Sequence, residues 1–191
     1  MASTTTLLTA DDLELVPGPD LPHELWRGVL RLVTYTAPPH GSVSARLLGA
    51  LAQYVYAHEL GTLFSEGTGF LLERDPDTVF CPDVAFLRKE RLPPGGLAEL
   101  RLSSLVLVPD LAVEVLSPND RPAMVRAKIA EYLRLGVRAV WMIDPKARAV
   151  RIHSRDGDRL IETRFAAHDT LDGGEVVPGW RCPVAALFAD L

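Results

Sequence analysis

Two acidic residues stand beside or inside apolar segments of this sequence, where charge is normally excluded. Asp83 follows a proline in CPDVAFLRKE, residues 81–90, and Glu114 lies inside PDLAVEVLSP, residues 109–118. An ionised carboxylate left unpaired in an apolar interior costs several kcal/mol. We therefore expect both carboxylates to meet a cation in the folded chain.

A divalent metal ion would satisfy both acids at once. We expect the strands that carry Asp83 and Glu114 to be neighbours in one sheet, and two close carboxylates repel each other unless a cation intervenes. Mg²⁺ takes oxygen ligands and keeps waters for a phosphate substrate, and the backbone carbonyl of Val115 could add a ligand. Mn²⁺ accepts the same ligands, so the pattern predicts a Mg²⁺ or Mn²⁺ site without choosing between the two ions.

A lysine on the following helix could complete this group. The spacing predicts a helix from about Arg121 to Leu135, stopped by Gly136. Lys128 lies beside the apolar stripe of this helix, so its ammonium could reach back over the strand end and stabilise charge developing on a phosphate. The residues expected to form the stripe are Val125, Ile129, Tyr132 and Leu133.

Each of these residues also has an ordinary structural interpretation. A Pro-Asp pair is often only a turn or the start of a strand, a strand glutamate can pair with an arginine, and a helix lysine usually faces solvent. The order and spacing of Asp83, Glu114 and Lys128 together indicate chemistry more strongly than any one of them.

The remaining elements suit an α/β domain with a mixed sheet. We expect a long helix within 38–61, capped by Ser42 and stopped by Gly61. A short helix capped by Thr9 should precede PGPD at 17–20. Strands or hairpins are expected at 23–35, 68–73 with 78–87, 110–116, 137–144, and 147–153 with 159–165, and the C-terminal segment should cover the core.

Length and composition indicate one packed domain over residues 1–191, with a loose start at 1–9. The 191 residues are 48% hydrophobic and 24% charged, which suits a packed core. The net charge of −5 argues against a strong, indiscriminate nucleic-acid binder. Segment 121–138 is nevertheless basic, and Arg121 and Arg126 could contact phosphates there; an ordinary solvated helix face is an equally good interpretation.

Cellular location is expected to be cytoplasmic. Cys81 and Cys182 lie far apart without metal-ligand spacing, which suggests free thiols. Neither a signal peptide nor an apolar run long enough for a membrane span is evident in the sequence.

Several segments, in order along the chain, resemble the Uma family of "putative restriction endonucleases", a branch of the PD-(D/E)XK nuclease superfamily. The resemblance extends from about residue 12 to 188, and its most specific block is PDLAVEVLSP followed by KIAEYLRLGVRAVWMIDP. The other matching segments are HELWRGVL, PPHGSVSARLLGAL, CPDVAFL and PGWRCPVAALF.

The resemblance implies a restriction-endonuclease-like core, with a mixed central sheet flanked by helices, and Asp83 and Glu114 as metal ligands. In the superfamily pattern a lysine stands two residues after the second acid, but here that residue is Leu116. Lys128 matches a lysine that the family places on the next helix. Glu24 matches a family glutamate that could be an outer metal ligand or base, or only a surface strand residue.

His40 matches the family's histidine before the long helix, where a structural role is commoner than a catalytic one. The resulting hypothesis is a Mg²⁺-dependent endonuclease that cuts duplex DNA, with a homodimer expected because one active site cuts one strand. An inactive nuclease-fold protein that binds DNA or protein, and a hydrolase of RNA or a smaller phosphodiester, are the alternatives.

Overall fold

The computed structural model describes residues 7–13, 15, 23–33, 35–98 and 100–191, and its central element is a six-stranded mixed sheet. The strand order is β10-β9-β8-β7-β6-β3, in which β7 and β8 are parallel and all other neighbours are antiparallel. Its strands are β3 (Gly61–Ser65), β6 (Val84–Arg88), β7 (Leu111–Val115), β8 (Ala139–Asp144), β9 (Ala149–Asp156) and β10 (Arg159–Phe165).

Two smaller sheets accompany it. One has the order β2-β1-β5-β4, and the other pairs β11 with β12. Their strands are β1 (His23–Trp26), β2 (Val29–Leu32), β4 (Phe70–Glu73), β5 (Thr78–Phe80), β11 (Thr170–Asp172) and β12 (Arg181–Pro183). The helices are α1 (Ala10–Leu13), α2 (Pro38–Ala57), α3 (Pro122–Arg134) and the 3₁₀ helices η1 (Lys89–Arg91) and η2 (Val184–Phe188). The mixed sheet with flanking helices confirms the expected fold class.

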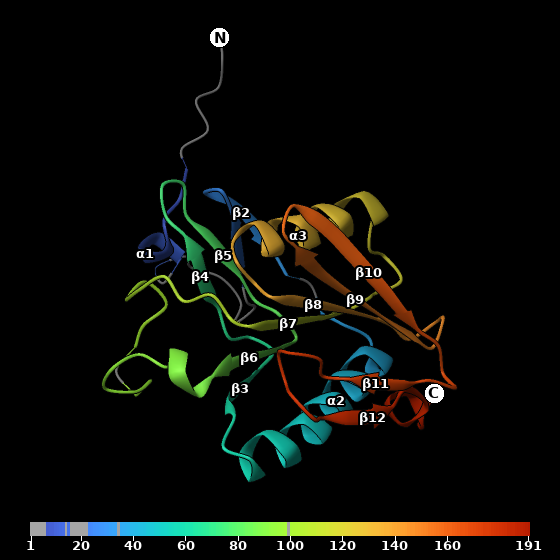
Figure 1. Cartoon of the computed structure of the whole chain (residues 1–191). Coiled ribbons are helices and arrows are strands. Elements are labelled where there is room, and N and C mark those ends of the chain that lie inside the picture. Colours follow the sequence, from blue (N-terminus) through green and yellow to red (C-terminus); the bar gives the residue numbers. More distant parts are fainter. Residues whose placement is uncertain (1–6, 14, 16–22, 34, 99) are drawn as a thin grey trace.

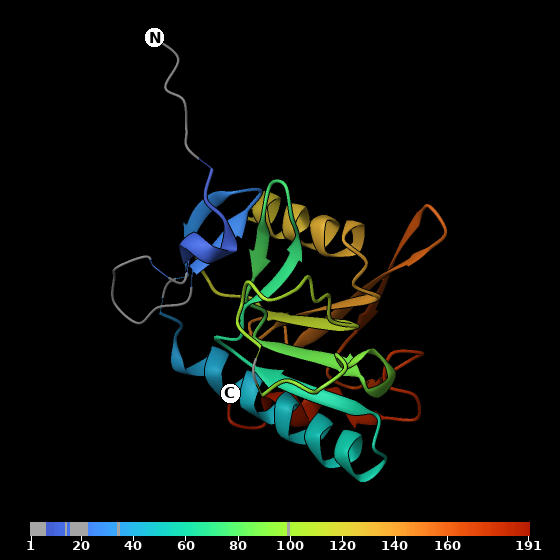
Figure 2. The same cartoon turned by 90° about the vertical axis from the view of Figure 1, so that its left-hand side faces the viewer.

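Helices α2 and α3 cover opposite faces of the central sheet (Figure 1). Side chains of a strand alternate between faces, so Val113 and Val115 of β7 pack with α2, while Ala112 packs with α3. The same alternation places Glu114 on the α3 face. Figure 2 shows α2 running beneath the sheet, with α3 above it.

Both predicted ends of α2 were wrong. The helix begins at Pro38. Proline has no N–H to donate, and the first positions of a helix have no intrahelical acceptor for one, so two prolines fit there. Ser42 therefore lies inside the helix. The helix ends at Ala57, and Gly61 is the first residue of β3. A side chain at Gly61 would place its Cβ 2.1 Å from the Leu87 carbonyl oxygen, so close strand pairing accounts for this glycine.

The predicted strand over 78–87 is two strands in different sheets, β5 and β6. The break at 81–83 leaves Asp83 directly before the first residue of β6, a strand of the central sheet. Three strands were not predicted, namely β3, β11 and β12. The turn between β9 and β10 lies at Gly157 and Asp158, so the predicted hairpin is confirmed with a longer first strand.

The terminal segments pack more closely than the sequence suggests. The Thr9 hydroxyl accepts a hydrogen bond from the Asp12 N–H, which confirms the cap of α1. Leu8 donates its backbone N–H to the Gly28 carbonyl, so the start is not loose throughout; residues 1–6 and PGPD at 17–20 lie outside the described residues. As predicted, the C-terminal segment covers the core, with Trp180 packed against Trp141 at a ring separation of 5.5 Å.

Both cysteines are free: Cys182 is buried and Cys81 is half-buried. Within the part of the chain that the structure describes, no helix is long and apolar enough to cross a membrane.

Candidate active site

Strand pairing brings three acidic residues together where neighbouring strands of the central sheet begin or end. Val84 of β6 pairs with Val113 of β7, so Asp83 lies beside the end of β7 that carries Glu114. Ser65 of β3 pairs with Val84, so Glu66 follows β3 next to Asp83. The expectation that the strands of Asp83 and Glu114 are neighbours is confirmed.

Lys128 of α3 joins two glutamates that come from different sheets. Its Nζ lies 2.9 Å from Oε1 of Glu114 on β7 and 2.9 Å from Oε1 of Glu24 on β1. The same oxygen of Glu24 accepts the backbone N–H of Cys81 at 2.9 Å. Glu24 is 7% exposed, and this geometry suits a residue that holds the lysine in place.

Burial and mutual charge set the protonation of this group. Desolvation raises the pKa of Glu114 to about 7, and the negative charges of Asp83 and Glu24 raise it as well. The positive charge of Lys128 lowers this pKa but only partly offsets these effects. Burial alone would lower the pKa of Lys128, but the two glutamates raise it above its usual range. Lys128 is therefore a fixed cation at neutral pH and cannot serve as a general base.

Tyr132 lies one helical turn after Lys128 and holds the same glutamate. Its hydroxyl donates to Oε1 of Glu114 at 2.6 Å. The tyrosine is fully buried, and burial raises the pKa of its phenol, which keeps the hydroxyl a donor. Oε1 of Glu114 is thus occupied by two donors, whereas Oε2 has no hydrogen-bond partner among the described residues.

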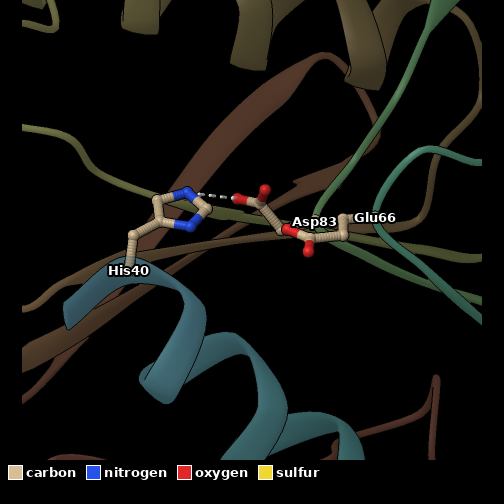
Figure 3. A group of neighbouring side chains, drawn as sticks. All are labelled: His40, Glu66 and Asp83. Atoms are coloured by element: carbon tan, nitrogen blue, oxygen red, sulfur yellow. Dashed lines mark ion pairs between the residues drawn. The ribbon is translucent and has the colours of Figure 1, made fainter. Parts of the chain in front are cut away.

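Asp83 is held by the backbone and by a histidine. Its Oδ2 accepts the N–H of Val115 at 2.7 Å and lies 3.1 Å from Nε2 of His40, in the first turn of α2. Burial would lower the pKa of His40, but the hydrogen bond to Asp83 and the charges of Glu66 and Glu114 raise it. Figure 3 shows His40, Asp83 and Glu66 together.

The residues present fit a divalent metal ion. Oδ1 of Asp83, like Oε2 of Glu114, has no hydrogen-bond partner in the described part of the chain. Nδ1 of His40 is a buried nitrogen without a partner. Free carboxylate oxygens and an unpartnered imidazole nitrogen are donors that such ions take in proteins.

Glu24, Glu114 and Lys128 line a pocket of about 180 Å³ that opens to the surface. Arg121 lies at this pocket, whereas Arg126 lines a neighbouring one. Both arginines are exposed, with no carboxylate at ion-pair distance among the described residues.

The basic character of segment 121–138 is weaker than its sequence suggests. Arg134 is paired with Glu73 and Glu131, and Arg138 lies 3.5 Å from Glu175. These carboxylates pair with two of the five cations, and Glu24 and Glu114 pair with Lys128. Among the described residues, the unpaired cations of the segment are therefore Arg121 and Arg126.

Sequence reasoning placed Asp83, Glu114 and Lys128 within one site but missed two of its members. Tyr132 was assigned only to the apolar stripe, which it does join, although its spacing of four residues from Lys128 puts both on one helix face. Glu66 gave no local signal; a strand at 61–65 paired with β6 would have revealed it.

A family model and a solved structure are similar to this chain. The model of the Uma2 family, described as "Putative restriction endonuclease", matches residues 10–185. The crystal structure of a "putative nuclease belonging to DUF820" from Anabaena variabilis superposes with a TM-score of 0.79 at 19% identity, covering 95% of this chain and 98% of that one. That likeness shows a shared fold. No curated protein matches the sequence.

Proposed function

Because the chain belongs to the Uma2 family of "putative restriction endonucleases", we propose that it is a metal-dependent endonuclease that hydrolyses phosphodiester bonds in duplex DNA. One observation carries the proposal: the Lys128 ammonium of α3 lies 2.9 Å from Glu114, the acid that strand pairing sets next to Asp83. The chain thereby supplies from a helix the lysine that the superfamily pattern puts at Leu116.

Asp83, Glu114 and the Val115 carbonyl are the proposed ligands of a Mg²⁺ or Mn²⁺ ion. When bound, such an ion polarises a phosphate and lowers the pKa of a coordinated water. The free oxygens of Asp83 and Glu114 are the protein's contribution to that binding.

The other side chains orient groups and carry charge. Lys128 stabilises negative charge that develops on the phosphate, because it stays protonated and is fixed by two glutamates. Glu24 and Tyr132 act as positioning residues, the first for Lys128 and the second for Glu114. Arg121 and Arg126 are proposed phosphate contacts, which would position a duplex without reading its sequence.

Cleavage of both strands requires two active sites, so we propose that two copies of the chain act together on one duplex. Sedimentation of the protein with and without DNA tests this point. A monomer under both conditions would count against it.

The function is tested by nicking of supercoiled plasmid with Mg²⁺, with Mn²⁺ or with EDTA. Wild type should cleave only with metal, and Asp83→Asn and Glu114→Gln should abolish cleavage while their thermal melting stays cooperative. Glu90→Gln, an exposed glutamate on η1, is the control for loss of one negative charge and should cleave like wild type.

Metal-dependent cleavage that survives both site substitutions would refute the assigned site. A folded wild type that cuts no DNA with either ion would refute DNA endonuclease activity. It would favour the inactive binding protein or, if RNA or a small phosphodiester is cut instead, the third hypothesis.

A further inference from the structure

We propose that His40, Glu66 and Asp83 form a binding position for a divalent transition-metal ion, with Mn²⁺ favoured over Mg²⁺. The position shares Asp83 with the proposed nuclease site. Its biological role therefore rests on the proposed function. It adds two ligands, His40 of α2 and Glu66, which follows β3.

Geometry brings one ligand atom from each of these residues into a small space. The three atoms all lie within 4.8 Å of one another. Nε2 of His40 lies 3.1 Å from Oδ2 of Asp83, and this contact holds the ring beside the carboxylates while Nδ1 has no partner among the described residues. Small side-chain movements would close the group around one ion.

Charge at this position calls for a cation. Glu66 and Asp83 have no lysine or arginine at ion-pair distance among the described residues, because Lys128 is bound to Glu24 and Glu114. Repulsion between neighbouring carboxylates is relieved when a positive ion lies between them. His40 alone provides at most one positive charge.

The imidazole supplies an independent indication of a ligand. His40 is 5% exposed, yet its Nδ1 forms no hydrogen bond. Figure 3 shows that the ring turns its nitrogen-bearing edge toward the two carboxylates. A buried polar atom without a partner costs about 1–3 kcal/mol, which metal ligation through Nδ1 would offset while Nε2 keeps its contact with Asp83.

The donor set selects the class of ion. Two carboxylates alone suit Mg²⁺, Ca²⁺ and Mn²⁺, whereas an imidazole nitrogen favours first-row transition ions. A mixed set of one imidazole and two carboxylates therefore binds Mn²⁺ more tightly than Mg²⁺.

Metal binding can be measured without any DNA. We would titrate the full-length protein with Mn²⁺ and follow free Mn²⁺ by electron paramagnetic resonance, with Mg²⁺ as competitor. His40→Gln and Glu66→Gln should each weaken Mn²⁺ binding by at least about tenfold. Pulsed spectra of bound Mn²⁺ should show nitrogen coupling that His40→Gln removes and Glu66→Gln retains.

Two matched controls separate ligation from loss of charge or of a histidine. His168→Gln removes an exposed histidine that lies 3.5 Å from Asp169, and Glu59→Gln removes an exposed glutamate paired with Lys89. Both should bind Mn²⁺ like wild type. Glu66 is itself exposed, so its substitution leaves a folded protein even if His40→Gln does not.

Wild-type Mn²⁺ binding no tighter than Mg²⁺ binding, or unchanged by Glu66→Gln, would overturn the inference. So would bound Mn²⁺ without nitrogen coupling. Failure of the proposed function is separate, since it would appear as normal Mn²⁺ binding by a protein that cleaves no phosphodiester. Mg²⁺-dependent DNA cleavage without a Mn²⁺ preference would instead leave the nuclease and remove this metal position.

Discussion

Replacing Lys128 by methionine should destabilise the protein strongly, and more so at high pH. The substitution keeps an unbranched side chain near Phe80 and Tyr132, whose rings lie 5.3 and 5.8 Å from Nζ. It removes the cation shared by Glu24 and Glu114. Two mostly buried carboxylates then face each other without compensation.

The expected loss follows from burial and distance. At 2.9 Å each contact represents about 6 kcal/mol of gross Coulomb attraction at an effective dielectric constant of about 20, most of which desolvation offsets. Removing one partner of a buried ion pair typically costs about 3–5 kcal/mol. We expect a loss of this size in the free energy of unfolding at pH 8.

The pH dependence has a definite sign. Desolvation already raises the folded-state pKa of Glu114 from 4.5 to about 7, and loss of Lys128 raises it further. Folded protein then binds more protons than unfolded protein above about pH 4.5, so stability falls as pH rises. Between pH 7 and pH 8 only the variant keeps Glu114 protonated, so the loss caused by Lys128→Met should be smaller at pH 5 than at pH 8 by up to about 1.4 kcal/mol, the equivalent of one pKa unit.

Urea unfolding followed by tryptophan fluorescence measures both quantities. Lys89→Met is the matched control, because Lys89 lies at the same 2.9 Å from Glu59 but both side chains are exposed. It should leave the free energy of unfolding nearly unchanged at either pH, because exposed ion pairs contribute little. A loss for Lys128→Met no larger than the control, or unchanged between pH 5 and pH 8, would refute the reasoning.

Two further predictions concern the same group. Tyr132→Phe removes the 2.6 Å hydrogen bond to Glu114 and should cost about 2 kcal/mol at pH 8 and less at pH 5, measured by the same unfolding curves; an equal loss at both pH values would contradict the link to the carboxylate. In the plasmid assay, Lys128→Met should slow nicking by about 10²–10³-fold, and adding Leu116→Lys should restore part of the rate, because residue 116 lines the same pocket as Glu114. A double variant no faster than Lys128→Met would count against interchangeable lysine positions.

Strand β7 and the apolar stripe of helix α3 were predictable, because the local periodicity of the sequence specifies both. The residues flanking Glu114 alternate between the two faces of β7, and the stripe of α3 follows the helical repeat, so both elements were placed correctly. The ends of α2 were misjudged because Ser42 and Gly61 carry cap-like residue types, whereas two prolines and a strand pairing decide the boundaries.

The pairing of β3 with β6 was not predictable from local sequence. GTLFS at 61–65 is too short and too weakly patterned to declare a strand, and only the tertiary structure places Glu66 beside Asp83. For the same reason the partners of Glu24 were not predictable, since Lys128 lies 104 positions away in the chain.

The sequence by itself determined which residues can carry charge inside this protein, because an acid within an apolar strand is visible in the order of residues. It also shows that residue 116, where the superfamily pattern has a lysine, is a leucine. Only the tertiary structure decided which charges meet: strand register brings Glu66 to Asp83, and the packing of α3 brings Lys128 to both glutamates. Such contacts depend on how distant segments pack, and no local pattern specifies them.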